Sequence, residues 1–121
     1  MKKINLSITG CMGRMGQQLI RSSNKNKEFK LVSLTESRNI NKKISGIKPS
    51  LNNISSFKKT DVIIDFTVPK CTLEVLKLAT KLKKRVVIGT TGFNKSEELL
   101  IKKFSKTIPI CLLYTSPSPR D

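Results

Sequence analysis

Residues 4–16 read INLSITGCMGRMG, a short apolar strand segment that runs directly into a turn with three glycines. Because it has no Cβ, Gly10 permits a sharp turn out of the strand. Gly13 leaves room for phosphate oxygens beside the backbone, and Gly16 lets the following helix pack closely against the strand. That helix directs its unpaired N–H groups and the positive end of its dipole towards an anion. The stretch therefore predicts a turn that holds the pyrophosphate of a dinucleotide.

Apolar segments and segments of helical periodicity alternate along the rest of the chain. We expect strands at residues 4–9, 29–36, 61–66, 85–89 and 108–112. We expect helices at 14–23, from Pro69 to about residue 83 and from Asn94 to about residue 105. The polar segment 38–57 has no clear period and is expected to be a loop. Met15 and Leu100 are expected on the inner faces of their helices.

The alternation of strands and helices predicts the fold class α/β. It indicates a Rossmann-type doubly wound parallel sheet with helices on both faces and right-handed crossovers. Ligands of such sheets bind beyond the carboxyl ends of the strands. The glycine turn, Glu36 and the GTTG segment at 89–92 all follow predicted strands at this edge, which favours one shared binding site.

Charged residues near the first two strands are candidates for cofactor binding. Glu36 lies about 20 residues after Gly16, where a carboxylate can accept hydrogen bonds from an adenosine ribose. The alternative is a solvated glutamate at the end of a strand. Arg14, in the first turn of the predicted helix, lies beside the phosphates or is an ordinary surface residue. Arg38 can pair with the 2′-phosphate of NADP or, equally, face solvent.

Two polar segments close the third and fourth predicted strands. Asp65-Phe66-Thr67 is interpreted as a helix-capping turn, because Asp and Thr both cap helices well. Gly89-Thr90-Thr91-Gly92 offers two hydroxyls and small glycines that can contact the nicotinamide end of a cofactor. The alternative for this second segment is a tight strand-to-helix turn without a ligand.

Composition limits the classes of function. The chain has 121 residues, enough for one domain. Its formal net charge is +16, from 24 Lys and Arg against 8 Asp and Glu, which we interpret mainly as a compositional bias, with anionic partners as the alternative. Without histidine, His-based acid/base chemistry and ordinary zinc sites are excluded within this chain, and no metal site is expected. Neither a signal peptide nor a membrane span is expected, which favours a cytoplasmic location.

The stretches GCMGRMGQQLI, LTES, DVIIDFTVP and VVIGTTGF together resemble the 4-hydroxy-tetrahydrodipicolinate reductase family, also called the dihydrodipicolinate reductase family. The resemblance covers roughly residues 3–111, the family's cofactor domain. It implies contacts with NADH or NADPH from the glycine turn, the ribose carboxylate and the GTT segment. Many members place Arg directly after that carboxylate, whereas this chain has Ser37 there and Arg38 next, so use of both cofactors is expected. The candidate cofactor-binding residues are Gly10, Cys11, Met12, Gly13, Arg14, Met15, Glu36, Arg38, Gly89, Thr90 and Thr91.

The resemblance also implies an activity. Family members are NAD(P)H-dependent enzymes that transfer hydride to 4-hydroxy-tetrahydrodipicolinate, a small-molecule substrate, in the diaminopimelate and lysine pathway. The family implies a homotetramer assembled through a substrate domain that this chain lacks. No catalytic residue is assigned in this chain, because the family's paired His and catalytic Lys belong to that domain. We therefore expect a fragment, truncated before the substrate domain and inactive alone.

The last residues depart from the family pattern. We expect a dinucleotide-binding domain at 1–111 and a non-family tail at 112–121, LLYTSPSPRD, as a sequencing artefact. Two Ser-Pro pairs cannot continue a central parallel strand, because proline lacks the N–H that the ladder needs. A natural tail is the alternative.

Two other functions remain open from sequence. One is a non-catalytic NAD(P)- or nucleic-acid-binding module, suggested by the charge of +16. The sequence lacks basic and aromatic interleaving and has only five Phe and one Tyr, so nucleic acid is not an expected partner. The other is a different oxidoreductase with the same domain, such as an aspartate dehydrogenase-like or semialdehyde dehydrogenase-like enzyme.

Overall fold

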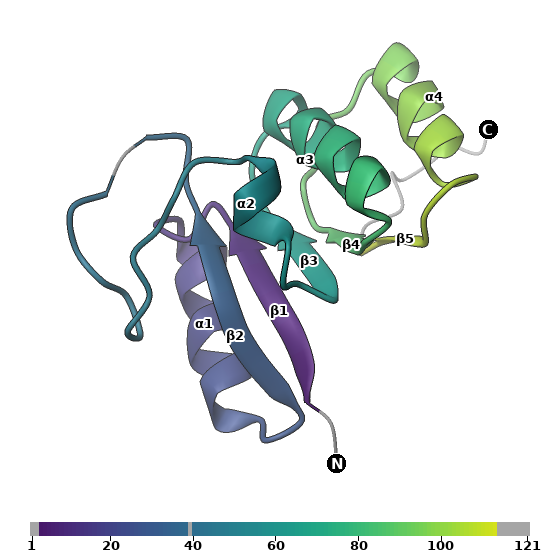
Figure 1. Cartoon of the computed structure of the whole chain (residues 1–121). Coiled ribbons are helices and arrows are strands. Elements are labelled where there is room, and N and C mark those ends of the chain that lie inside the picture. The colour runs from purple at the N-terminus through teal and green to yellow at the C-terminus, as the bar shows by residue number, and fades with distance from the viewer. Residues whose placement is uncertain (1–2, 39, 114–121) are drawn as a thin grey trace.

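The computed structural model describes residues 3–38 and 40–113 of the chain. All strand pairs in its sheet are parallel, and the strand order is β2-β1-β3-β4-β5 (Figure 1). This confirms the predicted α/β class and doubly wound sheet. The elements, in chain order, are β1 (Ile4–Thr9), α1 (Arg14–Lys25), β2 (Phe29–Thr35), α2 (Ile54–Phe57), β3 (Val62–Asp65), α3 (Pro69–Leu82), β4 (Arg85–Ile88), α4 (Lys95–Phe104) and β5 (Ile110–Leu112).

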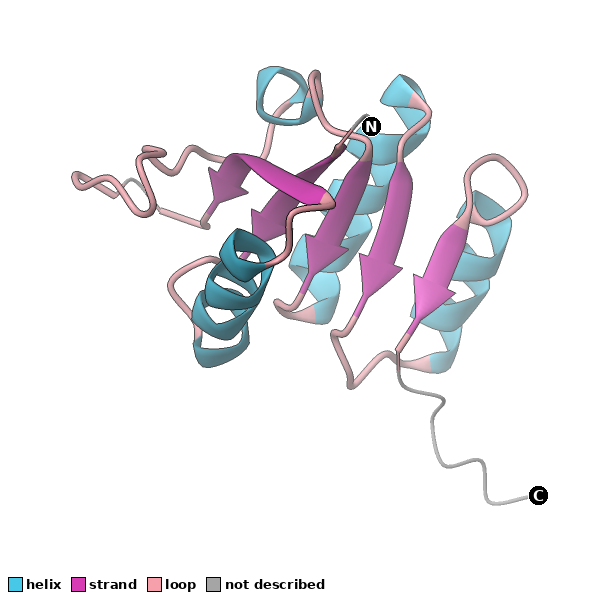
Figure 2. Cartoon of the chain, turned by 90° about the horizontal axis from the view of Figure 1, so that it is seen from below, coloured by secondary structure: helices cyan, strands magenta, loops and turns pink. Residues whose placement is uncertain are grey.

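Helices cover both faces of the sheet, as predicted. Helix α1 lies on one face against β1 and β2, whereas α2, α3 and α4 lie together on the other (Figures 1 and 2). The chain leaves β1 in one direction to form β2 and later returns to the other side of β1 to form β3. This reversal between β1 and β3 is the topological switch point, where open α/β sheets bind ligands. None of the described helices is long and apolar enough to cross a membrane.

Alternating side chains of the strands build an apolar core on each face. Ile63 packs in the cluster that contains α3 residues, whereas the neighbouring Ile64 packs against the cluster on the α1 face. This is the period of two that a strand buried on both faces requires. Helix α3 contributes Val75, Leu76 and Ala79 to its cluster, all fully buried and at helical spacing.

The carboxyl ends of the five strands are aligned. The last residue of β1, Thr9, pairs with the last residues of β2 and β3, Thr35 and Asp65. Asp65 pairs with Ile88 at the end of β4, and Ile88 pairs with Leu112 at the end of β5. The segments that follow the strands therefore start at one level, along one edge of the sheet.

Three expectations from sequence are wrong in detail. The segment 38–57 is not a loop throughout, because it ends in α2 and contains a hairpin turn in which Ile44 and Ile47 exchange both backbone hydrogen bonds. Met15 is 41% exposed and does not face the core. Leu100 is 43% exposed, whereas Ile101 beside it is buried. Helical spacing locates the apolar face to within a residue on either side, which explains both misplaced side chains.

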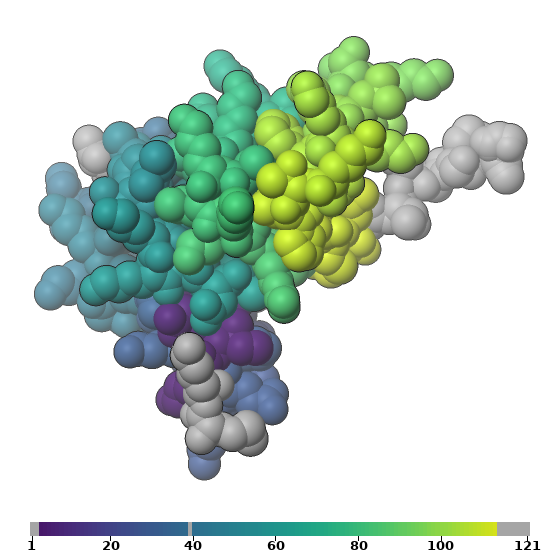
Figure 3. Space-filling view, turned by 45° about the vertical axis from the view of Figure 1, so that its right-hand side comes forward, coloured from purple at the N-terminus to yellow at the C-terminus, as the bar shows by residue number. Residues whose placement is uncertain are grey.

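The C-terminal flank of the described chain is formed by α4 and β5. Leu99 is 64% exposed there and Leu112 and Leu113 are about half exposed, and Figure 3 shows this flank in green and yellow at the surface. The Leu113 N–H donates to the Ile88 carbonyl oxygen at 2.9 Å, so sheet hydrogen bonding continues two residues past 111. Most of the predicted non-family tail, residues 114–121, lies outside the described residues.

Helix α1 approaches the turn before it closely at Gly16. A Cβ on Gly16 would lie 2.3 Å from the Gly10 carbonyl oxygen and 2.9 Å from the Cys11 Cα. Both contacts are with backbone, which cannot turn aside as a flexible side chain can. The third glycine of the motif is therefore required by packing.

We predict that Gly16→Ala lowers the free energy of unfolding by about 1–3 kcal/mol, the usual cost of overpacking. Urea denaturation of the chain measures this change. Gly13→Ala is the matched control, because its Cβ would approach only the Gly10 carbonyl oxygen, at 3.4 Å. Equal stability of the two variants would contradict this packing account.

Candidate functional site

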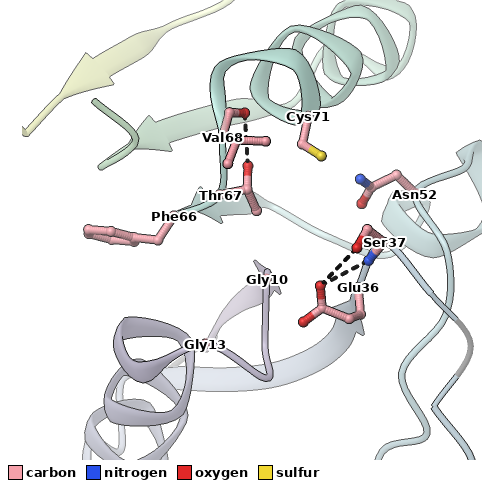
Figure 4. Close-up of a pocket in the computed structure, with 9 residues that line it drawn as sticks. All are labelled: Gly10, Gly13, Glu36, Ser37, Asn52, Phe66, Thr67, Val68 and Cys71. Carbon is pink, nitrogen blue, oxygen red and sulfur yellow. Dashed lines mark hydrogen bonds between the residues drawn. The ribbon is translucent and has the colours of Figure 1, made fainter. Parts of the chain in front are cut away.

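A cavity of about 280 Å³ opens at the carboxyl edge of the sheet, at the switch point between β1 and β3. Figure 4 shows residues from three elements around it: the turn after β1, the end of β2 with the loop that follows, and the β3–α3 turn. The lining residues are Gly10, Gly13, Glu36, Ser37, Asn52, Phe66, Thr67, Val68 and Cys71.

The glycine turn forms the floor of the cavity. Gly10 has a φ of +66°, in the left-handed region that favours glycine. A Cβ at this position would lie 2.8 Å from both the Phe66 carbonyl oxygen and the Thr67 Cγ2, so space also requires glycine. The Cys11 N–H donates to the Thr35 carbonyl oxygen at 3.2 Å and ties the turn to the end of β2.

Glu36 connects the end of β2 to the glycine turn. Its Oε2 accepts a hydrogen bond from the Met12 N–H at 3.0 Å, and its Oε1 accepts one from the Ser37 N–H at 2.9 Å. The carboxylate is half-buried and lines the cavity. These two backbone donors fix its orientation before any ligand arrives.

Two helices begin at the cavity without a side-chain cap. Helix α1 follows Gly13 and α3 follows Val68, and neither N-cap residue makes a side-chain cap hydrogen bond. The first turns of both helices also lack acidic residues. By contrast, α2 is capped by Asn53, and α4 has a complete capping box from Asn94 and Glu97. The uncapped N–H groups and the positive dipole ends of α1 and α3 therefore suit an anion in this cavity.

A buried carboxylate lies behind the cavity wall. Asp65 is fully buried and accepts hydrogen bonds from four threonine hydroxyls. Thr67 Oγ1 donates to Oδ1 at 2.9 Å, Thr90 Oγ1 donates to Oδ2 at 3.0 Å, and the hydroxyls of Thr9 and Thr72 also donate to this carboxylate. Sequence reasoning interpreted Asp65 only as part of a capping turn. The signal for this network was present as threonines at the ends of three predicted strands.

The predicted cofactor-binding residues lie in three kinds of environment. Gly10, Gly13 and Glu36 line the cavity, and Met12 contacts Glu36 through its N–H. Three others are buried: Cys11 in the core cluster beside α1, Thr90, which is bonded to Asp65, and Gly89. Gly89 lies against the Phe66 ring, where a Cβ would be 2.0 Å from Cε1. The remaining four are exposed outside the cavity lining: Arg14, Met15, Arg38 and Thr91.

Sequence reasoning missed the wall opposite the glycine turn. Asn52, Phe66, Val68 and Cys71 line the cavity but were not among the candidate residues. The Cys71 side chain is half-buried. Among the described residues, no group of three or more His, Cys, Asp or Glu side chains is placed to hold a metal ion.

The thiol of Cys11 gives a pH-dependent test of this geometry. Burial first, and the negative charge of Glu36 second, raise its pKa from 9.0 to about 11, although a backbone hydrogen bond opposes them. The native chain therefore holds a proton that the unfolded chain releases, so this group's contribution to stability is lost as pH rises from about 9 to about 11.

We predict that iodoacetamide labels the exposed Cys111 rapidly at about pH 9, whereas Cys11 reacts only as the pH approaches about 11, because the thiolate is the nucleophile. Peptide mass spectrometry separates the two rates. The urea-unfolded chain is the control, in which both thiols should react alike. Equal labelling of Cys11 and Cys111 in the native chain at about pH 9 would show that the Cys11 thiol is not buried with a raised pKa.

Comparison with known proteins supports the resemblance found in the sequence. The family model described as "Dihydrodipicolinate reductase, N-terminus" matches residues 4–114. The 4-hydroxy-tetrahydrodipicolinate reductase of Pelagibacter ubique (strain HTCC1062) is 74% identical over 110 residues, which cover 91% of this chain and 43% of that protein. The protein of the same name from Buchnera aphidicola subsp. Cinara cedri (strain Cc) is 39% identical over 120 residues, which cover 89% of this chain and 44% of that protein. The chain therefore spans less than half the length of these curated relatives.

A solved structure agrees with the family match. The dipicolinate-bound dihydrodipicolinate reductase from Paenisporosarcina sp. TG-14 matches with a TM-score of 0.70 and 26% identity, over 86% of this chain and 43% of that one. Because the family model matches almost the entire described part of the chain, the chain belongs to the dihydrodipicolinate reductase family.

Proposed function

We propose that this chain binds NADH or NADPH at the carboxyl edge of its sheet. We further propose that it is the cofactor-binding part of a 4-hydroxy-tetrahydrodipicolinate reductase. The observation that carries the proposal is the pair of uncapped helix N-termini, α1 and α3, which open with the glycine turn on one cavity. A pyrophosphate is the anion that such a turn and helix suit in doubly wound sheets. Glu36 beside them offers the acceptor that an adenosine ribose needs.

The residues fit different parts of the cofactor. The glycine turn from Gly10 to Met15 receives the pyrophosphate, Glu36 receives the ribose, and Arg38 is placed after β2 for a 2′-phosphate. The segment Gly89–Thr91, at the end of β4, is assigned to the nicotinamide end. The Thr90 hydroxyl already donates a hydrogen bond to Asp65. We therefore assign the contact with the nicotinamide end to the Thr90 backbone or to the residues on either side of it. Bound reduced nicotinamide supplies the hydride, and this chain holds and orients it.

The substrate is inferred from the names of the relatives. They are 4-hydroxy-tetrahydrodipicolinate reductases, so we propose that compound as the hydride acceptor of the whole protein. No side chain described here is assigned to proton transfer to the substrate. We therefore expect the chain alone to bind the cofactor without turnover, and we expect the whole protein to be a homotetramer.

Cofactor titrations test the ribose end. We predict that Glu36→Ala lowers the affinity for both NADH and NADPH about ten-fold, because hydrogen bonds to a charged group are lost. Arg38→Ala should lower the affinity for NADPH alone, about three- to ten-fold, because the pairing with the 2′-phosphate is lost. Nucleotide fluorescence measures both affinities.

Charge-matched controls lie at the opposite edge of the sheet. Glu28→Ala removes an exposed carboxylate just before β2, and Arg85→Ala removes an exposed guanidinium at the start of β4. Both variants should keep the affinities of the parent chain. If neither Glu36→Ala nor Arg38→Ala weakens either cofactor, the ribose-end assignment is wrong.

Cys71 provides an independent footprint of the cofactor. Its thiol lines the cavity, and burial, followed by the charges of Glu74, Asp65 and Glu36, raises its pKa. We predict that saturating NADH slows alkylation of Cys71 about ten-fold, because the nucleotide covers the thiol and its phosphates disfavour the thiolate further. Cys111 lies outside the cavity lining and should react at the same rate with and without NADH. Unchanged labelling of Cys71 would place the nucleotide elsewhere.

A further inference from the structure

One cavity residue has a side-chain atom without a hydrogen-bond partner. The Oδ1 atom of Asn52 is buried, and no partner is present for it among the described residues. A buried acceptor that stays unpaired costs free energy, so such an atom in a native chain calls for an explanation. Since Asn52 lines the cavity, a ligand donor can supply the missing hydrogen bond.

The backbone on both sides of Asn52 is held firmly. Ser50 pairs with β2: its carbonyl oxygen accepts from the Glu36 N–H and its own N–H donates to the Leu34 carbonyl oxygen, both at 2.9 Å. On the other side, the Asn53 Oδ1 accepts from the Ser56 N–H at 2.9 Å and caps α2. These anchors fix Asn52 beside Glu36, so little conformational freedom is left to lose when a ligand binds.

The position of Asn52 relative to Glu36 identifies the part of the cofactor that reaches it. If Glu36 binds the ribose, the base extends from that sugar into the same cavity. Figure 4 shows Ser37 and Asn52 on the side of β2 and its loop, with Val68 and Cys71 on the side of the β3–α3 turn. Val68 is 56% exposed and offers an apolar surface to the flat face of a base. Adenine carries an exocyclic amino group, a donor that matches an unpaired amide oxygen.

We propose that Asn52 reads the adenine of the cofactor by accepting a hydrogen bond from its exocyclic amino group. This inference rests on the proposed function and deepens it, because it assigns a specificity residue for the base. It also predicts which nucleotides are rejected. A hypoxanthine base presents a carbonyl acceptor at that position, so it cannot donate this hydrogen bond to the Asn52 Oδ1.

The test compares NADH with reduced nicotinamide hypoxanthine dinucleotide, in which a carbonyl replaces the exocyclic amino group and N1 of the base carries a proton. The chain should bind NADH about five-fold more tightly than the hypoxanthine analogue, the usual value of one hydrogen bond. Asn52→Leu should remove this preference, whereas Asn52→Asp, which keeps an acceptor, should retain it. The ratio of the two affinities is measured within each variant, so a general loss of binding does not imitate the result.

Two further measurements separate reading of the base from a structural role. Asn52→Leu should leave the urea midpoint unchanged or raise it, because it removes an unpaired acceptor. If Asn52 instead stabilised the fold, the same substitution would lower the urea midpoint. Thr35→Val is the matched control: Thr35 Oγ1 is the other buried side-chain atom without a partner among the described residues, and Thr35 does not line the cavity. It should keep the five-fold preference.

The outcomes are distinct. A parent chain that binds both nucleotides equally, or an Asn52→Leu variant that keeps the preference, overturns the role of Asn52 while leaving cofactor binding intact. A parent chain that binds neither nucleotide overturns the proposed function and this inference with it.

Discussion

The arrangement of the segments at the carboxyl edge of the sheet depends on the hydrogen bonds made to one buried carboxylate. Asp65 is fully buried, and its hydrogen-bond donors are four threonine hydroxyls from β1, the β3–α3 turn, α3 and the segment after β4. A buried charge is costly unless several hydrogen bonds compensate for it, so each of these segments is held to the same point. Thr90 extends the network, because its hydroxyl also accepts from the Thr67 N–H at 2.8 Å. The cavity wall is therefore a connected polar network and not a series of independent turns.

This network also explains why glycine is needed at positions that lie far apart in the sequence. Thr67, fixed by Asp65, lies so close to Gly10 that a Cβ there would be 2.8 Å from its methyl group. The Phe66 ring, next to Asp65 in the chain, lies against Gly89. Both glycines accommodate the β3–α3 turn, one from β1 and one from β4. Close packing on this turn therefore accounts for the glycines at both positions.

Local pattern predicted the fold and the glycine turn, since both depend on residues near in sequence. The parallel sheet and the helices on its two faces followed from the alternation of elements and the handedness of crossovers. Met15 and Leu100 were misplaced because periodicity alone does not fix where the buried face of a helix ends. Asn52 was out of reach for a different reason. It belongs to a segment without period, and only the pairing of Ser50 with β2 brings it to the cavity.

The carboxylate proposed for the ribose and the turn proposed for the phosphates cannot be treated as separate parts of the site. Glu36 holds the Met12 N–H through one oxygen and the Ser37 N–H through the other, so it organises the glycine turn in the absence of a ligand. Loss of this carboxylate would remove the proposed ribose acceptor and would also free the Met12 N–H within the glycine turn. Changes at Glu36 and at the turn should then be non-additive, because both act on one hydrogen-bonded unit. The free energy of the proposed cofactor binding therefore belongs to the connected set of residues, with Glu36 as the link between its two ends.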